Sequence, residues 1–167
     1  MKKIIFAGLV GFASISFFAC SNGDYDANPN TNNSNVGNPL LNNGGGNNNT
    51  TALTTGTWKI TEYTLTTSSG SSDLLGLVDD CEKDDLYTFQ TDKTILRDEG
   101  ATKCSPDNPQ TKTDGTWDIN GDKFTGTNDE GSQTWDIVTL DNSTFKITAT
   151  KTLNGENATA TQVYSRP

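Results

Sequence analysis

The alternation of apolar and polar residues after Gly56 is the feature that most restricts the fold of this 167-residue chain. Successive side chains of a β-strand point to opposite faces, so alternation predicts strands that bury one face. It is clearest in Phe145, Ile147 and Ala149, and short breaks rich in Gly, Asn and Asp separate the segments. Eight strands are predicted, over residues 57–66, 86–91, 94–98, 113–119, 122–128, 133–140, 143–151 and 158–166.

Tight turns between these segments predict that consecutive strands are antiparallel. Asn120-Gly121 is typical of a type I′ hairpin, because both central residues must accept a positive φ. Asp141-Asn142 and Asn154-Gly155 are further turn signals. Residues 72–80 are rich in leucine and predict either a short helix or an apolar loop. The result is one all-β domain over residues 56–167, large enough for a small barrel or sandwich.

The pattern Thr-Trp-x-Ile occurs three times and marks three of the predicted strands. Its tryptophans are Trp58, Trp117 and Trp135. In each strand the Trp and Ile would share one face, and Thr would lie on the other. The spacing between the copies is unequal, so the pattern predicts three core-facing strands and not a repeat architecture.

The N-terminus reads as a secretory signal that ends at a cysteine. Lys2 and Lys3 precede an uncharged, mostly apolar run, and Ala19-Cys20 follows it. This order is similar to a bacterial lipobox, in which the signal (residues 1–19) is removed and Cys20 carries the lipid. The alternative is a plain signal peptide with a chance cysteine. With a lipobox, the chain is expected to be anchored in the outer membrane through Cys20.

Residues 20–55 predict a flexible linker between the lipid and the domain. Asparagine, glycine and threonine dominate, and such a segment buries too little surface to offset the entropy of ordering it. Asp24 and Asp26 either resemble the short acidic signals that send lipoproteins to the cell surface or are ordinary linker charges.

Charge and composition exclude several classes of function. The formal net charge of −9 would become −11 on loss of Lys2 and Lys3, which disfavours nucleic acid as a partner. The chain has no histidine, so Ser-His and Cys-His catalysis and imidazole metal sites are excluded. We predict no catalytic residue, no metal site and no cofactor, and the sequence identifies no protein partner.

The chain contains three cysteines. With Cys20 used for lipid attachment, Cys81 and Cys104 remain as an even pair in an oxidising compartment. We predict a disulfide between them, and the alternative is two free buried thiols.

The folded region resembles the lipocalin-like domain of Bacteroidota lipoproteins. The residues that carry the likeness are Gly56-Thr57-Trp58, the stretch from Cys81 to Phe89, Cys104, Gly115-Thr116-Trp117 and the final Val163-Tyr164-Ser165-Arg166. The resemblance implies an antiparallel up-and-down barrel of about eight strands, tethered by lipid. It also implies that Trp58 packs beneath Arg166 at one end of the barrel.

The same resemblance implies a small apolar ligand inside the barrel. Its candidate contacts are the inward-facing residues Tyr87, Phe89, Trp117, Trp135, Gln162 and Tyr164. Related fatty-acid carriers have Arg-x-Tyr where this chain has Gln162-Val163-Tyr164, so the expected ligand is neutral or weakly polar. The alternative is a surface interaction or structural module, in which the same side chains fill the core.

Overall fold

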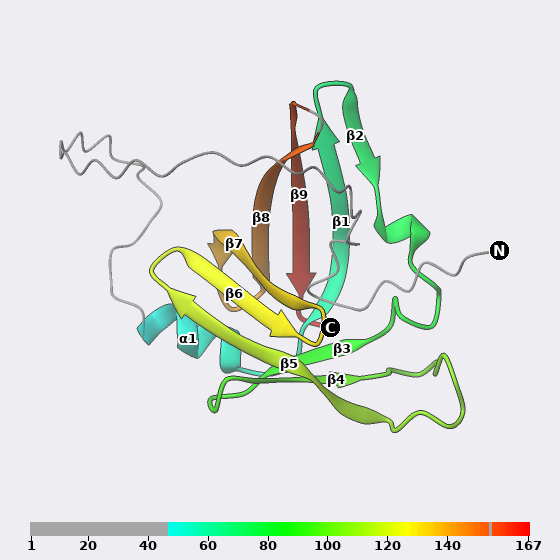
Figure 1. The fold of residues 1–167 in the computed structure, drawn as a ribbon. Helices are drawn as coiled ribbons and strands as arrows, with labels where there is room; N and C mark the ends of the chain where they lie inside the picture. The colour runs from blue at the N-terminus through cyan, green and yellow to red at the C-terminus, as the bar shows by residue number, and fades with distance from the viewer. Residues whose placement is uncertain (1–46, 154) are drawn as a thin grey trace.

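The computed structural model describes residues 47–153 and 155–167, which form one sheet with a short helix at one end (Figure 1). The predicted signal peptide, Cys20 and most of the predicted linker therefore lie outside the described residues. The elements are α1 (Asn47–Thr54), β1 (Lys59–Thr67), β2 (Gly70–Asp73), the 3-10 turn η1 (Leu75–Leu77), β3 (Leu86–Phe89), β4 (Thr94–Asp98), β5 (Thr111–Asn120), β6 (Lys123–Asn128), β7 (Gly131–Leu140), β8 (Thr144–Leu153) and β9 (Glu156–Ser165).

The strands follow one another in an up-and-down order, and all pairs are antiparallel. The sheet order is β2-β1-β9-β8-β7-β6-β5-β4-β3, so β1 returns to lie beside the last strand. All eight predicted strands are present, and the all-β, up-and-down prediction is confirmed. The ninth strand, β2, was missed because its four residues are all exposed and show no alternation.

The sheet is not closed into a barrel by a continuous ladder. A single bridge joins the two sides: Trp58 N donates to Tyr87 O at 2.8 Å, and Tyr87 N donates to Trp58 O at 2.7 Å. Beyond it, Thr64–Thr67 of β1 pair with β2, so that edge of β1 is not available to β3. Figure 1 shows the consequence, with β3, β4 and β5 crossing β1, β8 and β9 at a steep angle.

Two turns differ in detail from the sequence-based prediction. The β5–β6 hairpin pairs Asn120 with Lys123, so its loop is Gly121-Asp122, and only Gly121 has positive φ (62°). A positive φ at the first loop position alone is typical of type II′ and not of the predicted type I′. In the leucine-rich segment the helix is one short 3-10 turn, η1, with no buried residue.

The helix α1 corrects the predicted start of the domain. It occupies Asn47–Thr54, which was assigned to the flexible linker, and Leu53 is fully buried in the core. Trp58 Nε1 donates to Leu53 O at 2.8 Å and holds the end of the helix. The segment NNNTTALT has little intrinsic helix propensity, so these tertiary contacts decide its structure.

The predicted contact between Trp58 and Arg166 is confirmed. The guanidinium carbon lies 4.2 Å from the centroid of the Trp58 ring, which is itself fully buried. Arg166 Nη2 also donates to Ala52 O at 2.8 Å, and its Nε donates to Asn142 O. We call this end of the sheet the α1 end.

Aromatic side chains fill the interior near the α1 end. Phe89, Phe124 and Phe145 contact one another edge to face, with ring centroids 5.2 to 5.8 Å apart. Trp58 lies against Phe145 at 6.1 Å, and Trp117 is 2% exposed. The Thr-Trp-x-Ile prediction is confirmed here, because all three tryptophans are buried and their isoleucines pack against the core.

Candidate functional site

The interior changes from aromatic to polar along β3 and β4. Strand alternation turns Ile95 and Arg97 of β4 inward, and Glu99 after the strand is also buried. On the β3 side the buried residues are Tyr87 and, just before the strand, Asp85. We call the end where β3 begins, β4 ends and β5 begins the polar end.

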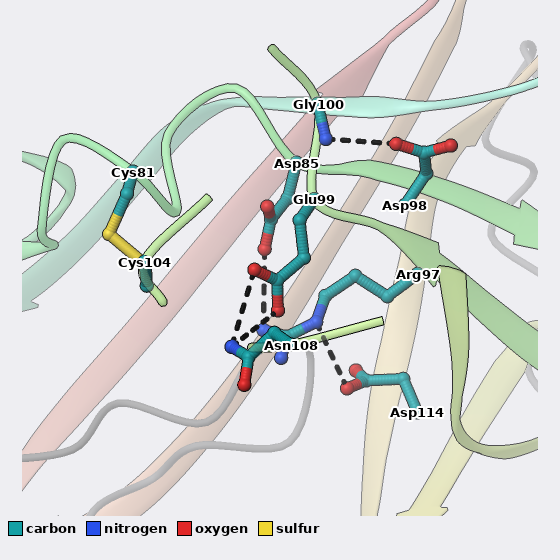
Figure 2. Close-up of polar contacts among 9 residues, drawn as sticks. All are labelled: Cys81, Asp85, Arg97, Asp98, Glu99, Gly100, Cys104, Asn108 and Asp114. Atoms are coloured by element: carbon teal, nitrogen blue, oxygen red, sulfur yellow. Dashed lines mark hydrogen bonds and ion pairs between the residues drawn. A yellow bond between two sulfur atoms is a disulfide. The ribbon is translucent and has the colours of Figure 1, made fainter. Parts of the chain in front are cut away.

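Arg97 is the centre of an ionic cluster at the polar end (Figure 2). Its Nη1 lies 3.3 Å from Asp85 Oδ2, and its Nε lies 3.4 Å from Asp114 Oδ1. Asp85 is 1% exposed and Arg97 is 8% exposed, so both charges have lost most of their water. Burial raises the pKa of Asp85 to about 7, and the attraction of Arg97 offsets this only in part.

The loops before β3 and after β4 form hydrogen bonds beside the ionic cluster. Asp84 Oδ2 accepts hydrogen bonds from Ala101 N and Thr102 N, each at 2.9 Å. Asn108 Nδ2 donates to both carboxylate oxygens of the buried Glu99, at 3.1 and 3.3 Å. Figure 2 shows Glu99 and Asn108 close to Arg97.

The predicted disulfide between Cys81 and Cys104 is confirmed, with a Cα–Cα distance of 5.1 Å. Cys81 belongs to the loop before β3, and Cys104 belongs to the loop after β4. The bond therefore ties together the two loops that carry Asp84, Glu99 and Asn108.

Three of the predicted ligand contacts come together near the ionic cluster. The Tyr87 side chain lies close enough to the guanidinium of Arg97 for the two to interact electrostatically. Its ring meets the ring of Tyr164 edge to face, with centroids 6.0 Å apart, and the Tyr164 hydroxyl donates to Gln162 Oε1 at 2.9 Å. Burial raises the pKa of both tyrosines, so their hydroxyls remain neutral hydrogen-bonding groups.

The other three predicted contacts, Phe89, Trp117 and Trp135, belong to the aromatic part of the interior. The rings of Phe89 and Trp117 meet edge to face at 6.1 Å, and Trp117 Nε1 donates to Gln90 O at 3.1 Å. Trp135 is 1% exposed. All three side chains belong to the hydrophobic core.

A pocket of about 440 Å³ opens beside Arg97. Its walls come from β4, the first half of β5 and the β6–β7 turn, and its lining residues are Arg97, Lys112, Thr113, Asp114, Gly115, Asn128, Asp129 and Glu130. At Gly115 (φ +146°) the backbone of β5 lies so close to β6 that a Cβ would collide with Thr127 O. Glycine is therefore required at the β-bulge that turns this wall.

The sequence-based prediction missed Asp85, Arg97, Glu99 and Asp114. A signal for Arg97 was present, because it is two residues from Ile95 on a strand whose inward phase was recognisable. Asp114 carried no such signal, since it lies in the bulge that shifts the β4–β5 register between Ile95 and Leu96.

The site offers charged and hydrogen-bonding side chains beside a pocket. Within residues 47–153 and 155–167, no group of three or more His, Cys, Asp and Glu side chains is placed to hold a metal ion. In the same part of the chain, no helix is long and apolar enough to cross a membrane. Buried charges, neutral tyrosine hydroxyls and an adjacent pocket can orient a small polar molecule.

Comparison with known proteins agrees with this architecture. A family model described as a lipocalin-like domain matches residues 54–147, more than half of the chain. The chain belongs to the lipocalin-like domain family. Among solved structures, a lipocalin-like protein from Bacteroides uniformis is similar, at 16% identity and a TM-score of 0.42, with 70% of this chain and 99% of that chain covered. No curated protein matches.

Proposed function

We propose that this lipocalin-like chain is a lipid-anchored, non-enzymatic protein of the bacterial outer membrane that binds a small ligand. The lipid would be carried by Cys20, and the residues before α1 would act as the spacer. The fold supports the binding part of the proposal, because lipocalin-like sheets enclose side chains that can line a site at one end.

The observation that carries the proposal is the pocket beside Arg97. It is large enough for a small molecule, and a buried charge forms part of its wall. Tyr87, Gln162 and Tyr164 do not line this pocket, but Tyr87 lies close to Arg97 and contacts Tyr164, which is hydrogen-bonded to Gln162. The ligand we propose is therefore small and polar, and it binds at the polar end.

The sequence alone favoured a small apolar ligand whose contacts would include Phe89, Trp117 and Trp135 as well as the three polar candidates. That ligand would have to displace aromatic contacts, because the ring of Phe89 meets three neighbouring aromatic rings at 5.8 to 6.1 Å. The same packing favours the second candidate function, a surface interaction or structural module with a filled core.

Native mass spectrometry of the full chain, purified from membranes in mild detergent, tests the proposal. We expect a small non-covalent adduct on the wild-type protein. The adduct should be lost in Thr113→Trp, because this exposed residue lines the pocket and the indole would fill it. Thr111→Trp is the matched control, since Thr111 is exposed on the same strand but outside the pocket. Absence of any adduct, or its persistence in Thr113→Trp, would contradict a ligand at this site.

A further inference from the structure

We propose that the pocket beside Arg97 selects a small zwitterion, a molecule with one ammonium group and one carboxylate or phosphate group. This inference rests on the proposed ligand-binding function and adds the chemical class of the ligand. It follows from the distribution of charge around the pocket, which has a basic wall and an acidic rim.

The basic wall is formed by Arg97 and Lys112, which are directly opposite each other on β4 and β5. Facing positions share a side of the sheet, and two like charges at such a pair are destabilising. Arg97 is partly neutralised by Asp85 and Asp114. Lys112 is attracted by Glu82 but forms no ion pair within 4.0 Å with any described residue. An anionic group of a ligand would relieve this repulsion.

Arg97 also has unused hydrogen-bonding capacity. Its Nε is buried and makes no hydrogen bond within the described residues, because Asp114 Oδ1 at 3.4 Å contributes charge without suitable geometry. Leaving a buried charged donor without a hydrogen bond is costly. If the Asp114 side chain moves aside, a carboxylate or phosphate oxygen of the ligand can reach this buried nitrogen and supply the missing acceptor.

The acidic rim comes from the two-residue turn between β6 and β7. Asn128 pairs with Gly131, so Asp129 and Glu130 form the tip of the hairpin, and Asn128 Oδ1 fixes the turn by accepting from Glu130 N at 2.9 Å. Both turn carboxylates line the pocket, and neither forms an ion pair with a described residue. They favour a cationic group at the mouth and disfavour a simple anion.

Isothermal titration of the full chain with matched probes tests this selectivity. L-Alanine carries both charges, N-acetyl-L-alanine only the negative one, and L-alaninamide only the positive one. Glycerophosphoethanolamine distinguishes a lipid headgroup from an amino acid as the source of the zwitterion. We expect at least one of the two zwitterions to bind about tenfold or more tightly than both singly charged probes.

Two variants assign the binding to the two walls. Lys112→Gln and Glu130→Gln should each weaken zwitterion binding by about tenfold, whereas Lys103→Gln and Glu156→Gln, outside the pocket, should not. Glu130→Gln should also improve the relative binding of N-acetyl-L-alanine. Equal binding of a singly charged probe, or no zwitterion binding, would overturn this inference. The mass-spectrometric adduct and its loss in Thr113→Trp would still stand, so the two failures are distinguishable.

Discussion

Asp85 is the residue whose charge should control the stability of the fold. In the unfolded chain it would ionise near its ordinary pKa of about 3.9. Burial raises its pKa in the folded protein to about 7, so between these values the folded state binds more protons than the unfolded state. Stability should therefore decrease as pH rises from about 4 to 7 and level off above that.

We predict that the free energy of unfolding is higher at pH 5 than at pH 8, by roughly 1–3 kcal/mol. Burial raises the pKa of Glu82 as well and adds to the effect in the same direction. Asp85→Asn should remove most of this pH dependence, while the exposed Asp79→Asn should retain it. Urea unfolding at the two pH values provides the measurement, and an unchanged pH dependence in Asp85→Asn would show that Asp85 is not responsible.

Arg166 is a second residue whose contribution can be isolated. Arg166→Gln removes the contact with the Trp58 ring and the hydrogen bonds to Ala52 O and Asn142 O. We predict a loss of about 1–3 kcal/mol, measured by urea unfolding. Lys146→Gln, on β8 and outside these contacts, should change stability by less than about 0.5 kcal/mol. If the two substitutions change the free energy of unfolding equally, the contacts of Arg166 contribute nothing to stability.

Among the elements, the loops before β3 and after β4 depend most on a single covalent bond. Cys81 and Cys104 are 23 residues apart, and closing a loop of this length is worth about 3 kcal/mol in the chain-entropy model. We predict that the double variant Cys81→Ser, Cys104→Ser loses stability of this order. Hydrogen exchange should also accelerate at Ala101 N and Thr102 N, which donate to Asp84. If exchange at these amides is unchanged, the loops are held by their hydrogen bonds alone.

Most of the sheet could be predicted because its strands alternate over several residues and end at recognisable turns. Phe145, Ile147 and Ala149 are all buried as expected. The exceptions have physical causes. The strand β2 is polar and is held only by pairing with β1, and α1 has weak intrinsic propensity and is held by Leu53 and Trp58. Neither kind of contact produces an alternating or a helical pattern in the sequence.

The candidate site was predictable only in its neutral part. Tyr87 and Tyr164 were identified because they share a face with apolar neighbours, and Gln162 because it takes the place of an arginine in related carriers. Arg97 was missed because an alternating pattern predicts apolar residues at inward-facing positions. Here the buried Asp85 and Asp114 stabilise an inward-facing charge. The pocket itself depends on the bulge at Asp114 and Gly115, which the sequence pattern does not reveal.

For the whole molecule, the lipid that we propose on Cys20 should determine where the domain is found. We predict that Cys20→Ala yields a chain that is no longer processed as a lipoprotein and no longer partitions into the detergent phase with membranes. Binding of the ligand should persist, because the pocket residues are remote in sequence from Cys20. Normal processing and detergent partitioning of the variant would contradict lipid attachment at this cysteine.

We propose that ligands bind at the polar end and not among the aromatic side chains. The most direct test is a ¹⁵N–¹H spectrum of the labelled protein, recorded with mixtures of small polar and of small apolar molecules. We predict that polar mixtures shift the amides of Lys112 to Gly115 and of Asp129 and Glu130, and leave the indole signals of Trp58, Trp117 and Trp135 unchanged. Shifts of the three indole signals by apolar mixtures, or no shift with either mixture, would contradict the claim.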